Sequence, residues 1–244
     1  MIFIEPPADR DVKTGKNHNK PPHIQSRKDF FDWLAQTIKI DGITKVERDT
    51  AFDDVPDYRN AGIRLIYTSI AEPMEGLRDG ALLEAGFDKV APNTPEDISS
   101  WLYDRAVASN VDIIDNRANA VPCYDPSYTF VEKLQTISTK FRNQQSDVGD
   151  PVGFMRHYYD VYELLQRPEV QEFIGTEEYK QHKQKRFRQG DNQNIAENEA
   201  FLLSDAETTA LYANAYDRSR ALYYDDPPSF EEIKTEIQEW IDKL

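Results

Sequence analysis

The chain has 244 residues, enough for one large domain or two small ones, and 39% of them are hydrophobic and 30% charged. Its 13 Tyr and 12 Phe supply material for a packed core and argue against disorder along the whole chain. The formal net charge of -15 repels polyanions on average, so binding to nucleic acid would require a local basic patch or a bound metal ion.

The cysteine content and the hydropathy of the chain point to a reducing compartment. Cys123 is the single cysteine, so no intramolecular disulfide can form, and we expect a small buried side chain there. No apolar run approaches the ~20 residues of a membrane-spanning helix, and the N-terminus lacks the blocks of a signal peptide. We therefore predict a cytoplasmic protein that does not enter a membrane.

The first half of the chain mixes short strands with helices. The apolar run at residues 2–4 predicts a short strand, and the polar residues 8–22 predict a loop. The spacing of the apolar residues over 26–40 predicts a helix, with Ser26 as its N-cap. Further strands are expected over 43–48, 62–69, 81–87, 111–114 and 121–124, and a further helix over 95–109.

After Pro126 the strand signals stop and helical patterns take over. Helices are expected over 127–142, 151–166, 168–173, 177–188, 205–222 and 229–244. Strands followed by helices indicate an α+β fold, with a small mixed β-sheet and flanking helices in one domain and a helical bundle in the next. We place the domains at residues 1–125 and 126–244.

Glu84 is the first candidate for chemistry, because it lies in the middle of the apolar strand over 81–87. A carboxylate there is costly unless it is paired, bound to metal or directed away from the core. The ordinary interpretation is a residue on the solvent face of a half-buried strand.

Lys133 is the second candidate. By helical spacing, Phe130 and Leu134 face the core and Lys133 lies beside them. A lysine in that place can extend to water, or it can be a fixed cation for a phosphate group.

Three polar side chains on the next helix form the third candidate. Arg156 and Asp160 are four residues apart and can pair, and His157 and Asp160 are three apart. This spacing gathers an arginine, a histidine and an aspartate on one side of the helix. The ordinary interpretation is an ion pair on the helix surface beside a satisfied histidine.

A basic segment follows further along the chain and could contact RNA phosphates. A solvated helix face is the competing interpretation. The residues concerned are Lys180, Lys183, Lys185, Arg186 and Arg188.

Two of these clusters resemble the AbiEii-type nucleotidyltransferases. The stretch Asp125-Pro-Ser-Tyr-Thr-Phe-Val-Glu-Lys-Leu134 followed by Arg156-His-Tyr-Tyr-Asp-Val-Tyr162 is similar to two consecutive helices of that family. The strand Gly80-Ala-Leu-Leu-Glu-Ala-Gly86 resembles the one that carries the family's third active-site carboxylate. Pro227-Pro-Ser-Phe-Glu-Glu-Ile233 resembles its closing helix, so the likeness covers nearly the whole chain.

The resemblance implies a polymerase-β-like sheet joined to a helical bundle, and transfer of a nucleotidyl group from a nucleoside triphosphate with Mg²⁺. Glu84 would be the third catalytic carboxylate, near the metal ions. Lys133 would hold the triphosphate, and Asp160 would be the family's helix aspartate, supported by Arg156 and His157. Relatives act as toxins beside a cognate antitoxin and some modify tRNA, which would make tRNA and an antitoxin candidate partners.

The sequence departs from the family at its start. The family's Gly-Ser turn and Asp-x-Asp strand bind the metal ions, and residues 2–5 resemble the end of that strand. Asp9 and Asp11 follow Pro6-Pro7 and do not fit this role. We therefore expect both aspartates to lie upstream of Met1, and residues 1–244 to lack transfer activity.

Two other interpretations stay open. The chain could be a non-catalytic remnant that binds nucleotide, RNA or antitoxin, or a helical interaction module without any link to nucleotides. An N-terminus of this kind also predicts an exposed apolar surface at residues 2–4, with self-association through it.

Overall fold

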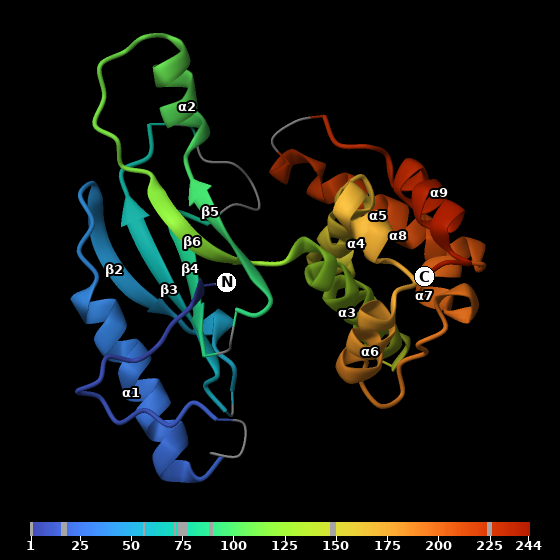
Figure 1. Ribbon diagram of the computed structural model, residues 1–244, viewed down its shortest axis with the longest axis horizontal. Coiled ribbons are helices and arrows are strands. Elements are labelled where there is room, and N and C mark those ends of the chain that lie inside the picture. Colours follow the sequence, from blue (N-terminus) through green and yellow to red (C-terminus); the bar gives the residue numbers. More distant parts are fainter. Residues whose placement is uncertain are drawn as a thin grey trace. The chain divides into compact units, whose positions relative to one another are not determined.

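The computed structural model describes residues 2–15, 19–55, 57–70, 72, 78–87, 90–146, 150–223 and 226–244. The chain divides into two compact units, Met1–Val90 and Ala91–Leu244. The first unit holds a four-stranded sheet with a long helix, and the second holds a two-stranded ribbon and a set of helices (Figure 1). This is the α+β fold that the sequence predicted.

The sheet of the first unit is mixed and has the strand order β1-β4-β3-β2. β1 (Ile2–Phe3) runs parallel to β4 (Ala81–Gly86). β3 (Asn60–Tyr67) is antiparallel to both of its neighbours, β4 and β2 (Ile43–Asp49). A short 3₁₀ turn, η1 (Thr50–Phe52), follows β2. These strands confirm those predicted at 2–4, 43–48, 62–69 and 81–87.

Helix α1 (Pro21–Thr37) begins five residues before the predicted start. Pro21 and Pro22 occupy its first positions, where a backbone N–H has no partner within the helix. The prediction of Ser26 as N-cap is wrong, because its hydroxyl lies inside the helix and donates to the carbonyl of His23. The helix ends at Thr37 because Ile38 adopts an extended conformation.

One face of the sheet packs against α1 and forms the core of the first unit. Phe31 contacts Phe87, with ring centroids 4.9 Å apart, and both rings are buried with Ala61 and Ala85 of neighbouring strands. Figure 1 shows α1 in blue beside the strands. In the stretch predicted to expose apolar surface, Ile2 is 59% exposed, whereas Ile4 packs against this core.

The ribbon of the second unit corrects one sequence-based prediction. Residues 95–98, predicted as the start of a helix, belong to strand β5 (Asn93–Ile98), which pairs with β6 (Ala118–Tyr124). The helix starts later, as α2 (Trp101–Ala108), because the Ser100 hydroxyl caps it by accepting from the Tyr103 N–H. The strand expected over 111–114 does not form.

The remaining helices confirm the predicted helical half, apart from two short elements that the sequence did not predict, η2 and α7. These helices pack around one large apolar core. Their ribbons are coloured from olive to red in Figure 1. The elements are α3 (Pro126–Ser146), α4 (Val152–Leu165), α5 (Pro168–Phe173), α6 (Glu177–Arg186), η2 (Ile195–Glu197), α7 (Glu199–Leu202), α8 (Ala206–Ser219), η3 (Arg220–Leu222) and α9 (Phe230–Trp240).

Helices α3 and α4 pack as an antiparallel hairpin, which positions the candidate site. Near the start of α3, the Ser127 hydroxyl donates to the carbonyl of Glu169, which lies beyond the end of α4. Near the other end of the hairpin, Phe141 and Phe154 both pack on the ring of Tyr212. The domain boundary near residue 126 marks the change from strands to helices along the chain and stays a prediction.

Among the residues that the structure describes, no helix has the length and the apolar character needed to span a membrane.

Candidate functional site

The α3–α4 hairpin brings Lys133 and Asp160 together, although 27 residues separate them in the chain. The Lys133 ammonium lies 2.7 Å from Oδ2 of Asp160. The side chains are 28% and 34% exposed, so the pair is sheltered but within reach of a ligand. Phe130 and Leu134 on α3 are fully buried, which fixes the helix face on which Lys133 projects.

His157 completes this centre from one turn earlier on α4. Its Nδ1 lies 3.5 Å from Oδ2 of Asp160, which is longer than a full hydrogen bond. Burial lowers the pKa of His157, and the charges of Lys133 and Arg156 lower it further, although the Asp160 carboxylate acts in the opposite direction. His157 is therefore a neutral imidazole at pH 7.

Asp160 is held in its ionised form. Burial raises the pKa of its carboxyl group, but the contacts with His157 and Lys133 outweigh burial, so the pKa lies below its ordinary value. Helical spacing allowed Arg156 to pair with Asp160, but this pair does not form among the described residues. Arg156 is exposed to solvent, and Asp160 pairs with Lys133 instead. The centre is thus a carboxylate between an ammonium group and an imidazole.

Two residues near this centre were missed by the sequence analysis. Lys140 is seven residues after Lys133 on α3, and this i, i+7 spacing could have indicated it. Tyr223 follows η3, its ring centroid is 4.4 Å from that of Tyr159, and its hydroxyl is buried. Burial raises the pKa of Tyr223, and the charge of Asp160 raises it further. No sequence pattern connects Tyr223 to α4, because only the fold brings them together.

Glu84 lies in the other unit, on β4. Its register partner on β3 is Gly62, and the partner of Gly62 on β2 is Asp49. All three positions point away from α1, because the next residues, Ala61 and Ala85, point into the core. Glu84 therefore occupies the sheet face opposite α1.

The donor set for Mg²⁺ that the family resemblance implies is not assembled by the described residues. They contain no group of three or more His, Cys, Asp or Glu side chains placed to hold a metal ion. Asp49 and Glu84 stand two strands apart, about 10 Å at ordinary strand spacing, whereas Mg²⁺–oxygen bonds are about 2.1 Å. Asp49 is moreover held by Arg64, whose Nη2 lies 2.6 Å from its carboxylate. These carboxylates do not fit a shared magnesium ion.

A small pocket of about 360 Å³ lies on the same unit, beside the Arg64–Asp49 pair, and Glu84 is not among its lining residues. Arg78 also reaches Asp49, at 3.4 Å. The arginines that line this pocket are thus already paired with carboxylates of the protein itself, Arg64 and Arg78 with Asp49, and Arg48 with Asp32 and Asp53. The lining residues are Glu47, Arg48, Asp49, Arg64, Ile66, Arg78 and Asp79.

The basic segment around α6 is mostly engaged within the protein. Lys180 pairs with Glu177 at 2.9 Å, and Arg186 pairs with Glu132 at 3.0 Å. Lys183 donates to the main-chain oxygen of Leu244, and burial lowers the pKa of Lys183 to about 8. Lys185 and Arg188 are exposed, so any contact of this segment with RNA would rest mainly on these two residues.

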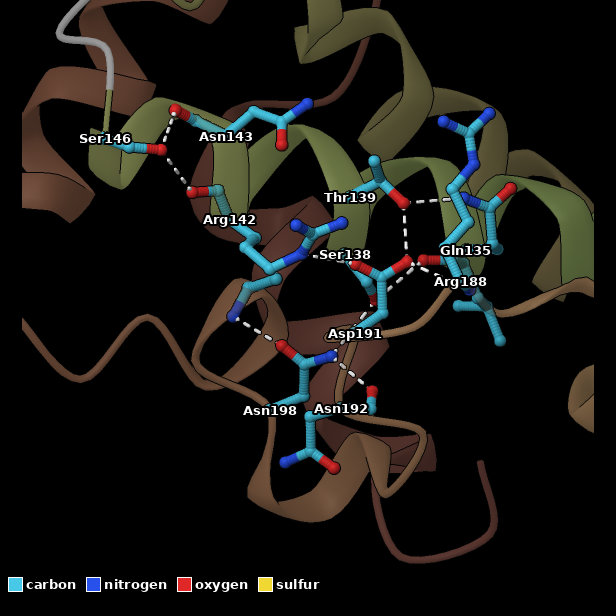
Figure 2. Close-up of polar contacts among 12 residues, drawn as sticks. Gln135, Ser138, Thr139, Arg142, Asn143, Ser146, Arg188, Asp191, Asn192 and Asn198 are labelled. Carbon is cyan, nitrogen blue, oxygen red and sulfur yellow. Dashed lines mark hydrogen bonds and ion pairs between the residues drawn. The ribbon is translucent and has the colours of Figure 1, made fainter.

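A second polar cluster lies on the opposite end of α3 and serves the fold. The side chain of Asp191 is fully buried and accepts hydrogen bonds from Thr139 at 2.5 Å and from Arg142 at 2.8 Å (Figure 2). Beside it, the Asn198 amide donates to Ser138 at 3.0 Å. Because these groups satisfy one another, the cluster fastens the loop after α6 to α3 and offers no open site.

One comparison with known proteins gave a match. A family model described as nucleotidyl transferase AbiEii toxin, type IV TA system, matches residues 9–238. That range includes β4 with Glu84 and the whole α3–α4 hairpin. Searches of curated proteins and of solved structures found no match.

Proposed function

Because the chain belongs to the AbiEii nucleotidyltransferase toxin family, we propose that its α3–α4 hairpin is the nucleotide-binding element of a nucleotidyltransferase. The observation that carries this proposal is the Lys133–Asp160 ion pair with His157 beside it. In the reaction, an acceptor oxygen bonds to the α-phosphorus of a nucleoside triphosphate, and the bond to pyrophosphate breaks. The proton of the acceptor oxygen passes to a base.

Lys133 is the group we propose for the triphosphate. An ammonium group binds phosphate oxygens as a compact charge, and Asp160 holds it extended at the surface of the hairpin. Asp160 also compensates this charge when no phosphate is bound. Arg156 and His157 lie on the same helix, where we propose that they assist phosphate binding and the orientation of Asp160. We propose Glu84, on the sheet, as the catalytic carboxylate of the other unit.

The proposed setting is a cytoplasmic toxin–antitoxin system. The family description supports a cognate antitoxin as a partner. We propose tRNA as the acceptor, reached through the exposed Lys185 and Arg188 of the basic segment.

A second candidate function is binding without transfer, to nucleotide, RNA or antitoxin. Its support is the lack of a magnesium donor set among the described residues, together with the internal pairing of Lys133.

One assay tests both candidates. Residues 1–244 are incubated with Mg²⁺, tRNA and each nucleoside triphosphate carrying a labelled α-phosphate. If the hairpin serves transfer, label enters RNA with the wild type and is lost in Lys133→Ala, because the triphosphate has no cation to hold it. Lys39→Ala removes an exposed lysine elsewhere and is the matched control.

Equal labelling by the wild type and Lys133→Ala would remove Lys133 from the site. Nucleotide binding without labelling would favour the second candidate.

A further inference from the structure

The α3–α4 hairpin carries two cations without an ion-pair partner among the described residues, Lys140 and Arg156. The other cations of these helices are neutralised, Lys133 by Asp160 and Arg142 by Asp191. Both unpaired side chains are exposed to solvent. In a chain with a net charge of -15, they form a local excess of positive charge.

The packing of the hairpin places these two cations near each other. Lys140 directly precedes Phe141, and Arg156 follows Phe154 by two residues. The rings of Phe141 and Phe154 both pack on Tyr212, with centroids at 6.2 and 5.4 Å. Desolvation lowers the pKa of Lys140, and the positive charge of Arg156 lowers it further, as expected for neighbouring cations.

The two cations also continue from the candidate site. Lys140 lies two turns from Lys133 on the same face of α3, about 10.5 Å along the axis. Arg156 lies one turn from Asp160 on α4. Lys133 and Asp160 are in contact, so the ion pair and the two unpaired cations follow one another along one side of the hairpin.

We propose that Lys140 and Arg156 form a second anion subsite, which binds a phosphate group of the ligand that Lys133 engages. This inference rests on the proposed function of the hairpin. A guanidinium fork binds two phosphate oxygens at once, and the ammonium group adds a compact charge. The phosphate belongs either to the polyphosphate chain of a nucleotide or to a nucleic-acid backbone.

The ordinary interpretation of exposed lysine and arginine side chains is a solvated surface. Here two like charges repel each other, and no carboxylate compensates them within the described chain, although the sequence contains 44 acidic residues. A bound phosphate would supply the missing negative charge. The geometry therefore favours an anion over water alone.

Binding to two probes tests the subsite. Tripolyphosphate is titrated by calorimetry, and a labelled single-stranded RNA by fluorescence anisotropy at several salt concentrations, both with EDTA present. The test variant is Lys140→Gln with Arg156→Gln. The control, Lys39→Gln with Arg105→Gln, removes one exposed lysine and one exposed arginine that lie outside the hairpin.

We expect the test variant to weaken one or both probes about tenfold, the loss of charged hydrogen bonds, and the control to leave both unchanged. If the test variant binds only tripolyphosphate more weakly, the subsite is assigned to the polyphosphate chain of a nucleotide. Weaker RNA binding alone, with the salt slope reduced by about 0.7 for one lost phosphate contact, assigns it to a backbone. Affinities of the test variant equal to those of the control for both probes would overturn the subsite.

Lys133→Ala in the same titrations keeps the two proposals apart. If Lys133→Ala weakens tripolyphosphate while the Lys140 and Arg156 substitutions weaken neither probe, the proposed function stands and the subsite falls. If only the Lys140 and Arg156 substitutions weaken it, the subsite stands and the role of Lys133 falls.

Discussion

At the scale of single residues, the charge state of the centre of the hairpin depends on the groups that surround the Asp160 carboxylate. Asp160 meets the ammonium group of Lys133 at 2.7 Å and the imidazole of His157 at 3.5 Å. The ammonium group compensates the charge of Asp160, so the buried imidazole can stay neutral. A neutral imidazole in such a place makes the protein sensitive to acid, because the group must take up a proton within a desolvated site.

The pH dependence of stability therefore depends on His157. Its pKa in the folded state lies below 6.5, so the unfolded chain binds more protons between that pKa and pH 6.5. The free energy of unfolding should fall as the pH decreases below 6.5. Urea unfolding at pH 7.5 and 5.5 measures this fall in the wild type, and we expect it to be smaller in His157→Gln.

Lys39→Gln, at an exposed position in the other unit, is the control and should keep the pH dependence of the wild type. An undiminished loss of stability in His157→Gln at pH 5.5 would contradict the assignment of the acid sensitivity to this imidazole.

At the scale of elements, the sequence predicts those helices and strands that are determined by the residues of the element itself. Apart from the short α7, the helices from α3 to α9 follow from apolar spacing and end signals, as in α9, where Ser229 and Glu232 form a capping box. The start predicted for the next helix, at residue 95, was wrong, because β5 is exposed along its whole length and its pairing with β6 is not visible in its own pattern.

The candidate site was predictable only in part, for the same reason. Lys133 and Asp160 were indicated by their own helices, but their contact comes from the packing of α3 on α4. The expected Arg156–Asp160 pair is local and did not form. Tyr223 reaches α4 from 64 positions beyond Tyr159 in the chain, so no local pattern could indicate it.

The loop between α6 and α7 gives a test at this scale. Asp191→Ala removes the acceptor for Thr139 and Arg142 and leaves their donors beside a cavity. We expect the free energy of unfolding to fall by about 2–3 kcal/mol, since a buried carboxylate is lost while its arginine is partly exposed. Chemical denaturation measures this change.

Asp242→Ala, at an exposed position near the end of the chain, is the comparison variant and should change stability by less than about 0.5 kcal/mol. If the two substitutions had equal effects, the buried cluster of Figure 2 would not hold the loop.

At the scale of the whole molecule, the chain consists of two units with separate cores. The first core contains few buried apolar residues, around Phe31 and Phe87, whereas the second joins most of its helices. The proposed nucleotide-binding residues all lie in the second unit, and Glu84 lies in the first. In a chain of strongly negative net charge, the two unpaired cations of the hairpin, Lys140 and Arg156, mark a place for a negatively charged ligand.

The central claim is that the hairpin binds a nucleoside triphosphate through Lys133. Equilibrium binding of a fluorescent nucleoside triphosphate to residues 1–244 tests it most directly, with Lys133→Ala and the control Lys39→Ala measured alongside. We predict a dissociation constant raised about tenfold or more in Lys133→Ala and unchanged in Lys39→Ala. Equal affinities in all three proteins, or no binding by the wild type, would contradict the claim.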